Sequence, residues 1–477
     1  MANKPAKWTR RRTARTVFVG TLLFSIVYVL WMAFAPPPRF PISKETTRFT
    51  EPLLPDGTVD FKTAVWRANG WPTPTSKPDR WDELMATTPN DAVHYRRPSE
   101  CAYNKQPLTA TEISAANVRS SLRSSIPFSA LEDPEFAQVI ADNEPWYQAI
   151  IESEPETAPE WHGQNMFRAS QIANRFELRA MLHLGNGDTA KGLESIRFIS
   201  RLAERQREQL SLFRLMVSSG IDNKAMAAAR SALLTADEPS PELIDCVMEI
   251  TRDIELNQCF ATSIDKLERY RALEFLCGPM TSTGPFPQPS HAKLAERLKF
   301  NWLRHRIDWH ELADFYHETM DGFSQRYRIE DPVRRAAELA EFRLSMSSRL
   351  SGSKASLGDW NHLNSWNHVV SGNATDGMKR WVLDGLVFKT VGLTEADISR
   401  RRLTRLTIYL AAFRRKTGHY PKSLSELDGT IPEEHANIRL DALNKPFVYE
   451  VTETGFQLRL SNPDSTIPVG IEWPLPE

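Results

Sequence analysis

Three side chains that can ligate a metal recur at helical spacing in the second half of the chain. His310, Asp314 and His317 stand at positions i, i+4 and i+7, so an α-helix would place them on one face. Two imidazoles and a carboxylate can bind zinc or iron and leave coordination positions open for a substrate. The alternative is a polar, solvated helix face with its apolar neighbours buried. We expect the protein to need no cofactor, with zinc or iron at these residues as the alternative.

A short Trp-Asn-His repeat is a candidate ligand-binding loop. It begins at Trp360 and again at Trp366, which places His362 and His368 at matching positions. Indole faces pack on apolar surfaces, and amide and imidazole groups pair with hydroxyls, so the repeat could bind a sugar or a peptide. The alternative is that the tryptophans pack this loop onto neighbouring helices.

The cysteines allow one disulfide without requiring it. Three of the four, Cys246, Cys259 and Cys277, are close in sequence. Outside the cytoplasm any two of these could pair, and the alternative is that they are buried apolar thiols. The sequence contains no Walker A, G-x-S-x-G or C-x-x-C motif, so no catalytic residue is assigned.

Residues 16–35 form the clearest single element of the sequence. These 20 residues carry no charge, and as a helix they would span about 30 Å, the hydrocarbon thickness of a bilayer. Residues 1–15 hold six basic side chains and no acid, which places the N-terminus in the cytoplasm by the positive-inside rule. Cleavage after Ala35 remains the alternative. The length of the segment and the following Pro36 favour an uncleaved signal anchor in contact with lipid.

Composition narrows the classes of protein that fit. The 477 residues are 41% hydrophobic and 25% charged, as in ordinary folded proteins, which excludes collagen, polytopic transporters and wholesale disorder. The net charge is −1, so there is no general basic field and we expect no nucleic-acid partner.

The chain divides by composition into five parts. A basic tail (1–15) and the anchor (16–35) precede a Pro-rich extended segment (36–106). A helical body (107–393) follows, in which short breaks and caps separate apolar stripes at helical spacing, as in the helix pairs of an α-solenoid. Gly185-Asn186-Gly187 should break one helix, with Asp188 capping the next, and Ser240-Pro241 should begin another. A small α+β module (394–477) ends the chain.

The predicted α+β module combines one helix with a β-hairpin. Residues 398–415 carry an apolar helical face, and Gly418 is a natural helix end. Residues 447–451 and 456–460 alternate apolar and polar side chains around a short turn, the pattern of a hairpin. The fold class is therefore mainly α, with one transmembrane helix and a small α+β module.

Two resemblances add to this reading. The C-terminal region resembles the soluble module of type II secretion major pseudopilins, in which a helix runs into a G-x-Y-P turn, an L-x-x-L segment and an N-x-P-[FY]-x-Y hairpin. The matching residues are Gly418, Tyr420, Pro421, Leu424, Leu427, Asn444, Pro446, Phe447 and Tyr449. The whole layout is also similar to a set of uncharacterised bacterial membrane-anchored proteins. That similarity implies a single-pass protein of the bacterial inner membrane with a periplasmic body.

These observations favour a membrane-anchored extracytoplasmic scaffold that binds unidentified protein partners. One alternative is a metal-dependent or envelope-directed hydrolase that uses the candidate residues above. Another is an accessory of a secretion apparatus, which the pseudopilin resemblance implies.

Overall fold

The computed structural model of the 477-residue chain describes most of the predicted body and the C-terminal module. The described ranges are 127–132, 134–153, 165–208, 211–269, 308–349, 392–453, 455–461 and 470–473, with isolated residues 51, 52, 60, 63, 64, 67, 83, 84, 375, 376 and 379. Residues 16–35 lie outside them. Within these ranges no helix combines the length and apolarity needed to cross a bilayer.

The chain forms two compact units. The first comprises residues 1–71, 268–322 and 343–387, and the second comprises residues 72–267, 323–342 and 388–477. The second unit contains most of the described helices and the three-stranded sheet.

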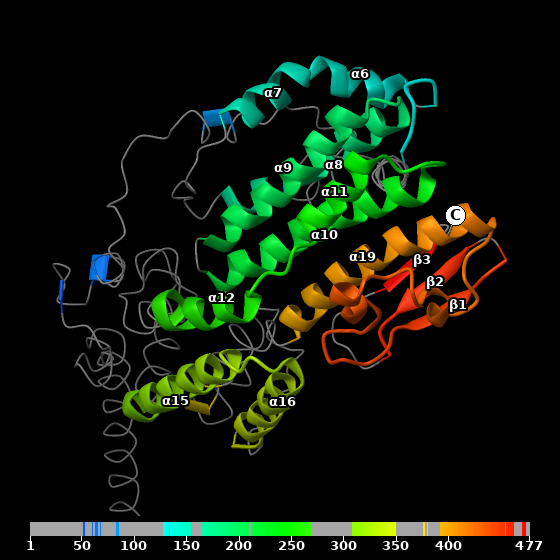
Figure 1. Cartoon of the computed structure of the whole chain (residues 1–477). Helices are drawn as coiled ribbons and strands as arrows, with labels where there is room; N and C mark the ends of the chain where they lie inside the picture. The colour runs from blue at the N-terminus through cyan, green and yellow to red at the C-terminus, as the bar shows by residue number, and fades with distance from the viewer. Residues whose placement is uncertain are drawn as a thin grey trace, which may run out of the picture. The chain divides into compact units, whose positions relative to one another are not determined.

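Two long antiparallel helices form the core of the second unit. Helix α8 (Asn165–Gly185) and helix α9 (Thr189–Glu208) lie side by side (Figure 1). The predicted break between them is confirmed. Gly187 adopts φ of 80°, a conformation that glycine tolerates best, and Asp188 accepts a hydrogen bond from the Lys191 N–H in the first turn of α9.

Helix α10 (Leu212–Thr235) is the central element of this unit. It packs against α8, α9, α11 (Pro241–Ile250) and α19 (Leu393–Thr417). A helix covered on this many sides must be buried around most of its circumference, and α10 accordingly lacks a wide polar face. Ser240 caps α11 as predicted, since its side chain accepts from the Leu243 N–H and Pro241 begins the helix.

Two short helices, α6 (Pro134–Asp142) and α7 (Glu144–Glu152), precede this core. The segment before them crosses the end of α8, where the Phe128 N–H donates to the Met181 carbonyl. The crossing requires a glycine, because a Cβ on Gly185 would lie 2.2 Å from the Phe128 carbonyl oxygen.

Beyond α11 the chain continues as α12 (Leu256–Ser263), which runs into a single π-helical turn (Ile264–Glu268). The Phe260 ring of α12 stacks on the Tyr327 ring, with 5.3 Å between the ring centroids. This contact packs α12 against the end of α15 (Trp309–Tyr327). Helix α16 (Pro332–Arg349) follows α15, and the boundary between the two units falls within both helices.

The last part of the second unit is built on α19. The helix begins after Gly392 and ends at Gly418, which have φ values of 86° and 82°. The predicted stop at Gly418 is confirmed, and the helix starts five residues earlier than the predicted position 398. Two 3₁₀ segments, Leu424–Leu427 (η5) and Glu433–Arg439 (η6), pack on it.

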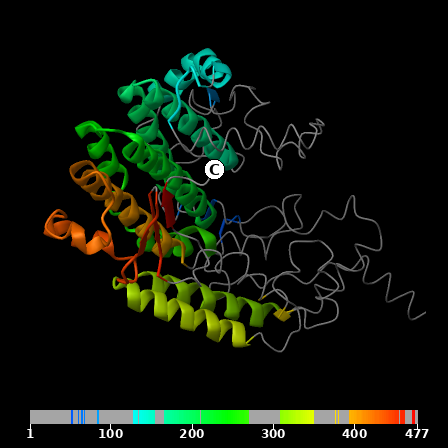
Figure 2. The same cartoon turned by 90° about the vertical axis from the view of Figure 1, so that its right-hand side faces the viewer.

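The predicted hairpin is confirmed and belongs to a three-stranded antiparallel sheet. Strand β1 (Val448–Val451) pairs with β2 (Phe456–Arg459), with Tyr449 opposite Leu458. A third strand, β3 (Gly470–Trp473), pairs with the other edge of β2 and was not predicted. The sheet lies against α19, as Figures 1 and 2 both show.

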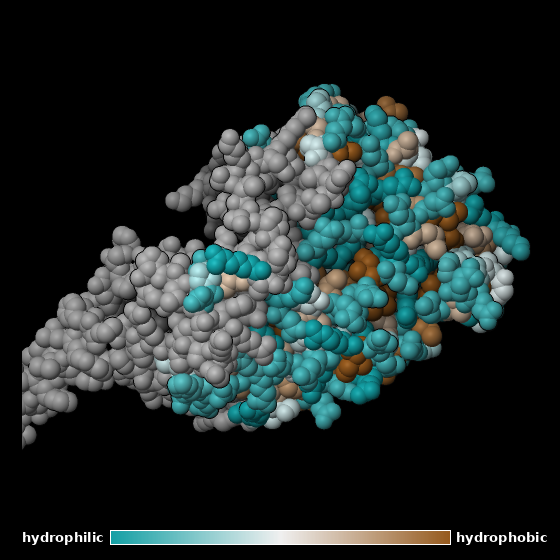
Figure 3. All heavy atoms as spheres, turned by 60° about the vertical axis from the view of Figure 1, so that its left-hand side comes forward, coloured by the Kyte–Doolittle hydropathy of each residue, from teal (hydrophilic) through white to brown (hydrophobic). Residues whose placement is uncertain are grey.

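A compact apolar core joins α19 to this sheet and to the 3₁₀ segments. Its buried members are Leu234, Ala396, Leu403, Leu406, Leu410, Tyr420, Leu427, Ile438, Phe447, Phe456 and Leu458. One of them, Leu234, belongs to α10. Helix α19 therefore shares its apolar contacts between the sheet and the helical core. On the face drawn in Figure 3, the described surface is mainly hydrophilic, and its hydrophobic side chains form small separate patches.

Candidate functional site

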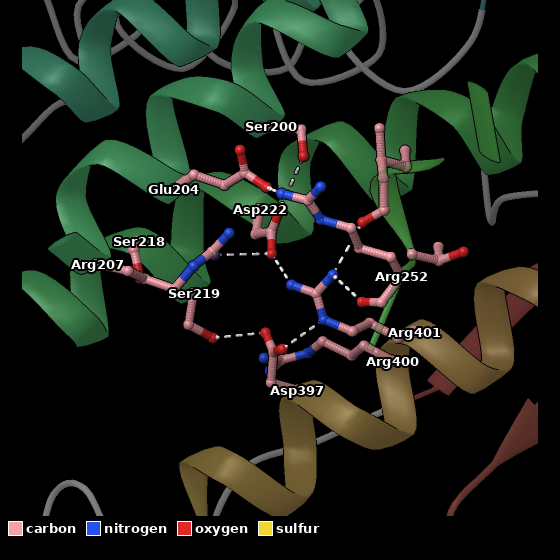
Figure 4. A network of polar contacts seen from close by, with 12 residues as sticks. Ser200, Glu204, Arg207, Ser218, Ser219, Asp222, Arg252, Asp397, Arg400 and Arg401 are labelled. Carbon is pink, nitrogen blue, oxygen red and sulfur yellow. Dashed lines mark hydrogen bonds and ion pairs between the residues drawn. The ribbon is translucent and has the colours of Figure 1, made fainter. Parts of the chain in front are cut away.

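A buried network of charged side chains connects α9, α10 and α19 (Figure 4). The Asp222 carboxylate of α10 forms ion pairs with Arg207 of α9, at 3.1 Å, and with Arg401 of α19. The Arg401 guanidinium also donates to Asp397, at 2.8 Å, and Asp397 accepts from the Ser219 hydroxyl at 3.3 Å. Arg207, Asp222, Asp397 and Arg401 are called the central network below.

The central network is charge-balanced, with two guanidinium groups and two carboxylates. Burial alone would lower the pKa of Arg401, but Asp397 and Asp222 raise it above its ordinary value. Burial raises the pKa of Asp222, and the charges of Arg401 and Arg207 oppose that rise. Because each buried charge faces an opposite charge, the network acts as a specific joint between the helices.

Arg401 and the adjacent Arg402 extend this joint to the ends of neighbouring elements. Arg401 donates to the carbonyls of Ile250, the last residue of α11, and of Arg252, at 2.9 and 3.2 Å. Arg402 donates to the Asp441 carbonyl at 2.6 Å, between η6 and β1. The arginines thus satisfy carbonyl groups where helix α11 and segment η6 end, positions that lack an internal partner.

These contacts hold the loop that leads into β1. The Asp441 carboxylate accepts from the Leu443 and Lys445 N–H groups, at 2.8 and 2.9 Å. The Ala442 N–H donates to the Ser399 hydroxyl of α19 at 3.0 Å. The chain entering the sheet is therefore fixed to the same helix face that carries the central network.

A groove of about 720 Å³ opens on the sheet module between η5, η6 and β1. Its lining residues are Ser423, Leu424, Ser425, Ala436, Asn437, Arg439, Leu440, Pro446, Phe447 and Tyr449. The Tyr449 hydroxyl donates to the Pro421 carbonyl at 2.9 Å, and burial raises its pKa well above the ordinary value. Tyr449 therefore stays neutral and fixes the wall of the groove.

Another buried arginine, Arg179 of α8, has a different environment. It donates two hydrogen bonds to Glu144, at 2.6 and 3.0 Å, one to Glu194 at 3.1 Å and one to the Ser195 hydroxyl at 2.7 Å. These four residues are called the Arg179 cluster. Burial alone would raise the pKa of Glu144, but the neighbouring His183 and Arg179 hold it well below the ordinary value.

The three candidate metal ligands lie on α15, as the spacing predicts. His310 and Asp314 are exposed and His317 is half-buried, while Leu312, Phe315 and Tyr316 are buried. The adjacent Glu311 pairs with Lys379. Across the described ranges, no group of three or more His, Cys, Asp or Glu side chains is arranged to hold a metal. Zinc or iron binding at these residues stays a prediction.

The remaining candidates are only partly described. Trp360, His362, Trp366 and His368 lie outside the described residues, as does Cys277. The thiols of Cys246 and Cys259 are both free. Burial raises the pKa of Cys246 to about 11, so this thiol remains protonated at neutral pH.

Neither the central network nor the groove was predicted from the sequence. The available signal was the run of four arginines between positions 400 and 405, within a helix that also carries a continuous apolar stripe. An arginine on such a stripe must find a partner, but the sequence does not show which carboxylate supplies it.

Comparison with known proteins assigns the chain to no family. No family model, curated protein or solved structure matches the chain.

Proposed function

We propose that the protein is a membrane-anchored extracytoplasmic scaffold that binds a protein partner through its C-terminal module. In this proposal residues 16–35 anchor the chain in the bacterial inner membrane. The N-terminus lies in the cytoplasm and the body in the periplasm. The uncharged length of the anchor and its basic flank support this orientation.

The groove beside β1 is the observation that carries the proposed binding role. Strand β1 is an edge of the three-stranded sheet, and Val451 at its end is 46% exposed. An exposed strand edge can receive an extended peptide as an additional strand, and adjacent pockets then select its side chains. The mainly apolar groove next to this edge suits such a segment.

The backbone pattern indicates which groups would receive the peptide. The Phe447 N–H donates to the Arg439 carbonyl on the outer side of the strand. Since backbone groups alternate in direction along a strand, the N–H groups of Tyr449 and Val451 point away from β2. Tyr449 lines the groove and Val451 lies two residues further along the same strand edge, and these two positions are the proposed attachment points.

The arrangement of the helical core fits a scaffold. We propose that α8, α9, α10 and α11 represent helix pairs of an α-solenoid-like body, whose stacked helices leave an extended surface for partners. The arginine contacts of α19 support a rigid attachment of the sheet module to this body.

Site-specific photo-cross-linking in producing cells tests the binding role. A photoreactive amino acid at Asn437, an exposed residue of the groove, should give a defined cross-linked product, whereas one at the exposed Arg415 should not. Val451→Pro should reduce the product because it removes an outward N–H, and Val451→Ala should preserve it. Equal cross-linking from both positions, or a product insensitive to Val451→Pro, would refute the strand-edge role.

A fused reporter tests the proposed topology separately. Alkaline phosphatase fused after Glu477 should be active, because that enzyme folds only outside the cytoplasm. Deleting residues 1–35 should abolish this activity. An inactive fusion that is stably produced would contradict a periplasmic body.

A further inference from the structure

Two arginines beside the central network have no carboxylate of their own. Arg230 belongs to α10 and Arg400 to α19, and both are half-buried. Among the described residues, no carboxylate forms an ion pair with either guanidinium group, although the central network lies one residue along the helix from Arg400. Arg230 and Arg400 are called the outer pair below.

The Arg230 guanidinium reaches the face of α19 that carries both Arg400 and Thr404. The Arg230 Nη1 donates to the Thr404 hydroxyl of α19 at 2.8 Å, and that hydroxyl donates to the Arg400 carbonyl at 2.8 Å. Arg400 and Thr404 are four residues apart, so they share one face of α19. Arg400 lies beside Asp397 in Figure 4, but this carboxylate already accepts from Arg401 and Ser219.

The charges of the outer pair are poorly compensated. Burial and the like charge of Arg400 lower the pKa of Arg230 to about 10, and burial also lowers the pKa of Arg400 despite the nearby Asp397. The central network is neutral by itself, so the outer pair adds two positive charges that no ion pair among the described residues offsets. A partly buried charge of this kind is stabilised by a counter-charge.

We propose that the outer pair binds a phosphate-type oxyanion, either free phosphate or the phosphate of a small monoester. A dianion matches the excess of two charges, which one carboxylate would leave half-compensated. Each guanidinium offers a planar fork of donors that fits phosphate oxygens. Because both side chains are only half-buried, an anion can reach them from solution. The Thr404 hydroxyl positions Arg230 for this contact.

Isothermal titration calorimetry of the purified full-length chain tests this site. Inorganic phosphate, added at constant ionic strength set with chloride, should bind at one site. Arg230→Gln and Arg400→Gln should each weaken binding at least about tenfold, since each removes a charged hydrogen-bonding partner. Arg415→Gln, at an exposed position in the last turn of α19, is the matched control and should bind as the wild type does.

Further titrations resolve the ligand and the role of Thr404. Glycerol 3-phosphate distinguishes a monoester from free phosphate, and acetate reports on a singly charged carboxylate. Thr404→Val should weaken phosphate binding, and Thr404→Ser, which keeps the hydroxyl, should restore it. The affinity for phosphate should also rise with pH as phosphate loses its second proton and becomes a dianion, since both arginines stay charged at neutral pH.

Two results would overturn the proposal. One is heat no larger than that of a chloride blank, and the other is equal affinity in the wild type and in the Arg230→Gln/Arg400→Gln variant. Acetate binding as tight as phosphate binding would reject a dianion site. Far-ultraviolet circular dichroism checks that every variant is folded. The result is independent of the cross-linking test, because the outer pair lies outside the groove.

Discussion

The central network and the outer pair both bridge α10 and α19, but only the arginines of the central network form ion pairs with carboxylates. Asp222 and Asp397 neutralise Arg207 and Arg401. Arg230 meets the Thr404 hydroxyl and the like charge of Arg400 instead, and Arg400 lies near an Asp397 carboxylate that already accepts from Arg401. The Arg179 cluster agrees with the first case, since two glutamates surround one arginine. Burial of an arginine therefore does not mark a binding site by itself. The presence or absence of a neutralising carboxylate makes the distinction.

The largest effect is expected from breaking the balance of the central network. Asp222→Asn would leave Arg207 and Arg401 facing each other across a neutral side chain. Removing one partner of a buried ion pair typically costs about 3–5 kcal/mol of unfolding free energy. Urea unfolding followed by circular dichroism measures this cost. Asn223→Ala, the adjacent half-buried residue, is the control, and an equal loss in both variants would show that Asp222 has no special role.

A smaller loss is expected from the Arg179 cluster. Arg179→Gln removes the cation, but its partners Glu144 and Glu194 keep 25% and 37% of their side-chain exposure and can be hydrated. The expected destabilisation is about 1–3 kcal/mol, the cost of a lost charged partner at a part-buried site. Urea unfolding again provides the measurement. A loss exceeding that of Asp222→Asn would reverse the ranking of the two sites.

The pH dependence of the unfolding free energy should reveal the contribution of the Glu144 carboxylate. Its pKa in the folded protein lies below the ordinary value of 4.5, so its contribution is present above that pH and is lost as pH falls through the folded pKa. The stability difference between wild type and Glu144→Gln should thus be largest near neutral pH and shrink under acid conditions. Urea unfolding of both proteins across this range checks the sign, and a difference that grows on acidification would exclude the assignment.

The smallest effect is expected at the surface of the sheet. Glu450 of β1 pairs with Arg459 of β2 at 2.6 Å, and both side chains are more than half exposed. Glu450→Gln should change the unfolding free energy by at most about 1 kcal/mol, since exposed ion pairs are hydrated and screened by salt. If Glu450→Gln lost as much unfolding free energy as Arg179→Gln, the solvent exposure of an ion pair would not explain the difference between the two sites.

Local signals in the sequence predict local structure well. The Ser240-Pro241 start of α11, the stop at Gly418 and the pairing of β1 with β2 each depend on a few adjacent residues, and all three are confirmed. Strand β3 is as short as β1 and β2, but residues 460–469 separate it from β2, so it lacks the short turn that identified the other two strands as a hairpin.

The candidate sites depend on contacts that no local pattern encodes. Asp222 and Arg401 are 179 positions apart, so only the packing of α10 against α19 brings them together. The arginine run of α19 reads as a polar helix face in the sequence, yet Arg401 is 2% exposed in the fold. Conversely, the helical spacing of His310, Asp314 and His317 is correct, but a shared helix face does not by itself bring ligands into one coordination sphere.

The central claim is that Arg179 is compensated by carboxylates whereas Arg230 and Arg400 are not. The most direct test replaces the arginines of each site by glutamine and compares the variants in phosphate-free chloride buffer. Unfolding free energies are measured for the wild type, Arg179→Gln and Arg230→Gln/Arg400→Gln. Because the outer pair has no carboxylate to lose, the double variant should be at least as stable as the wild type, while Arg179→Gln should be less stable. A loss in the double variant as large as that of Arg179→Gln would contradict the account, because it would show that the chain already compensates both outer charges.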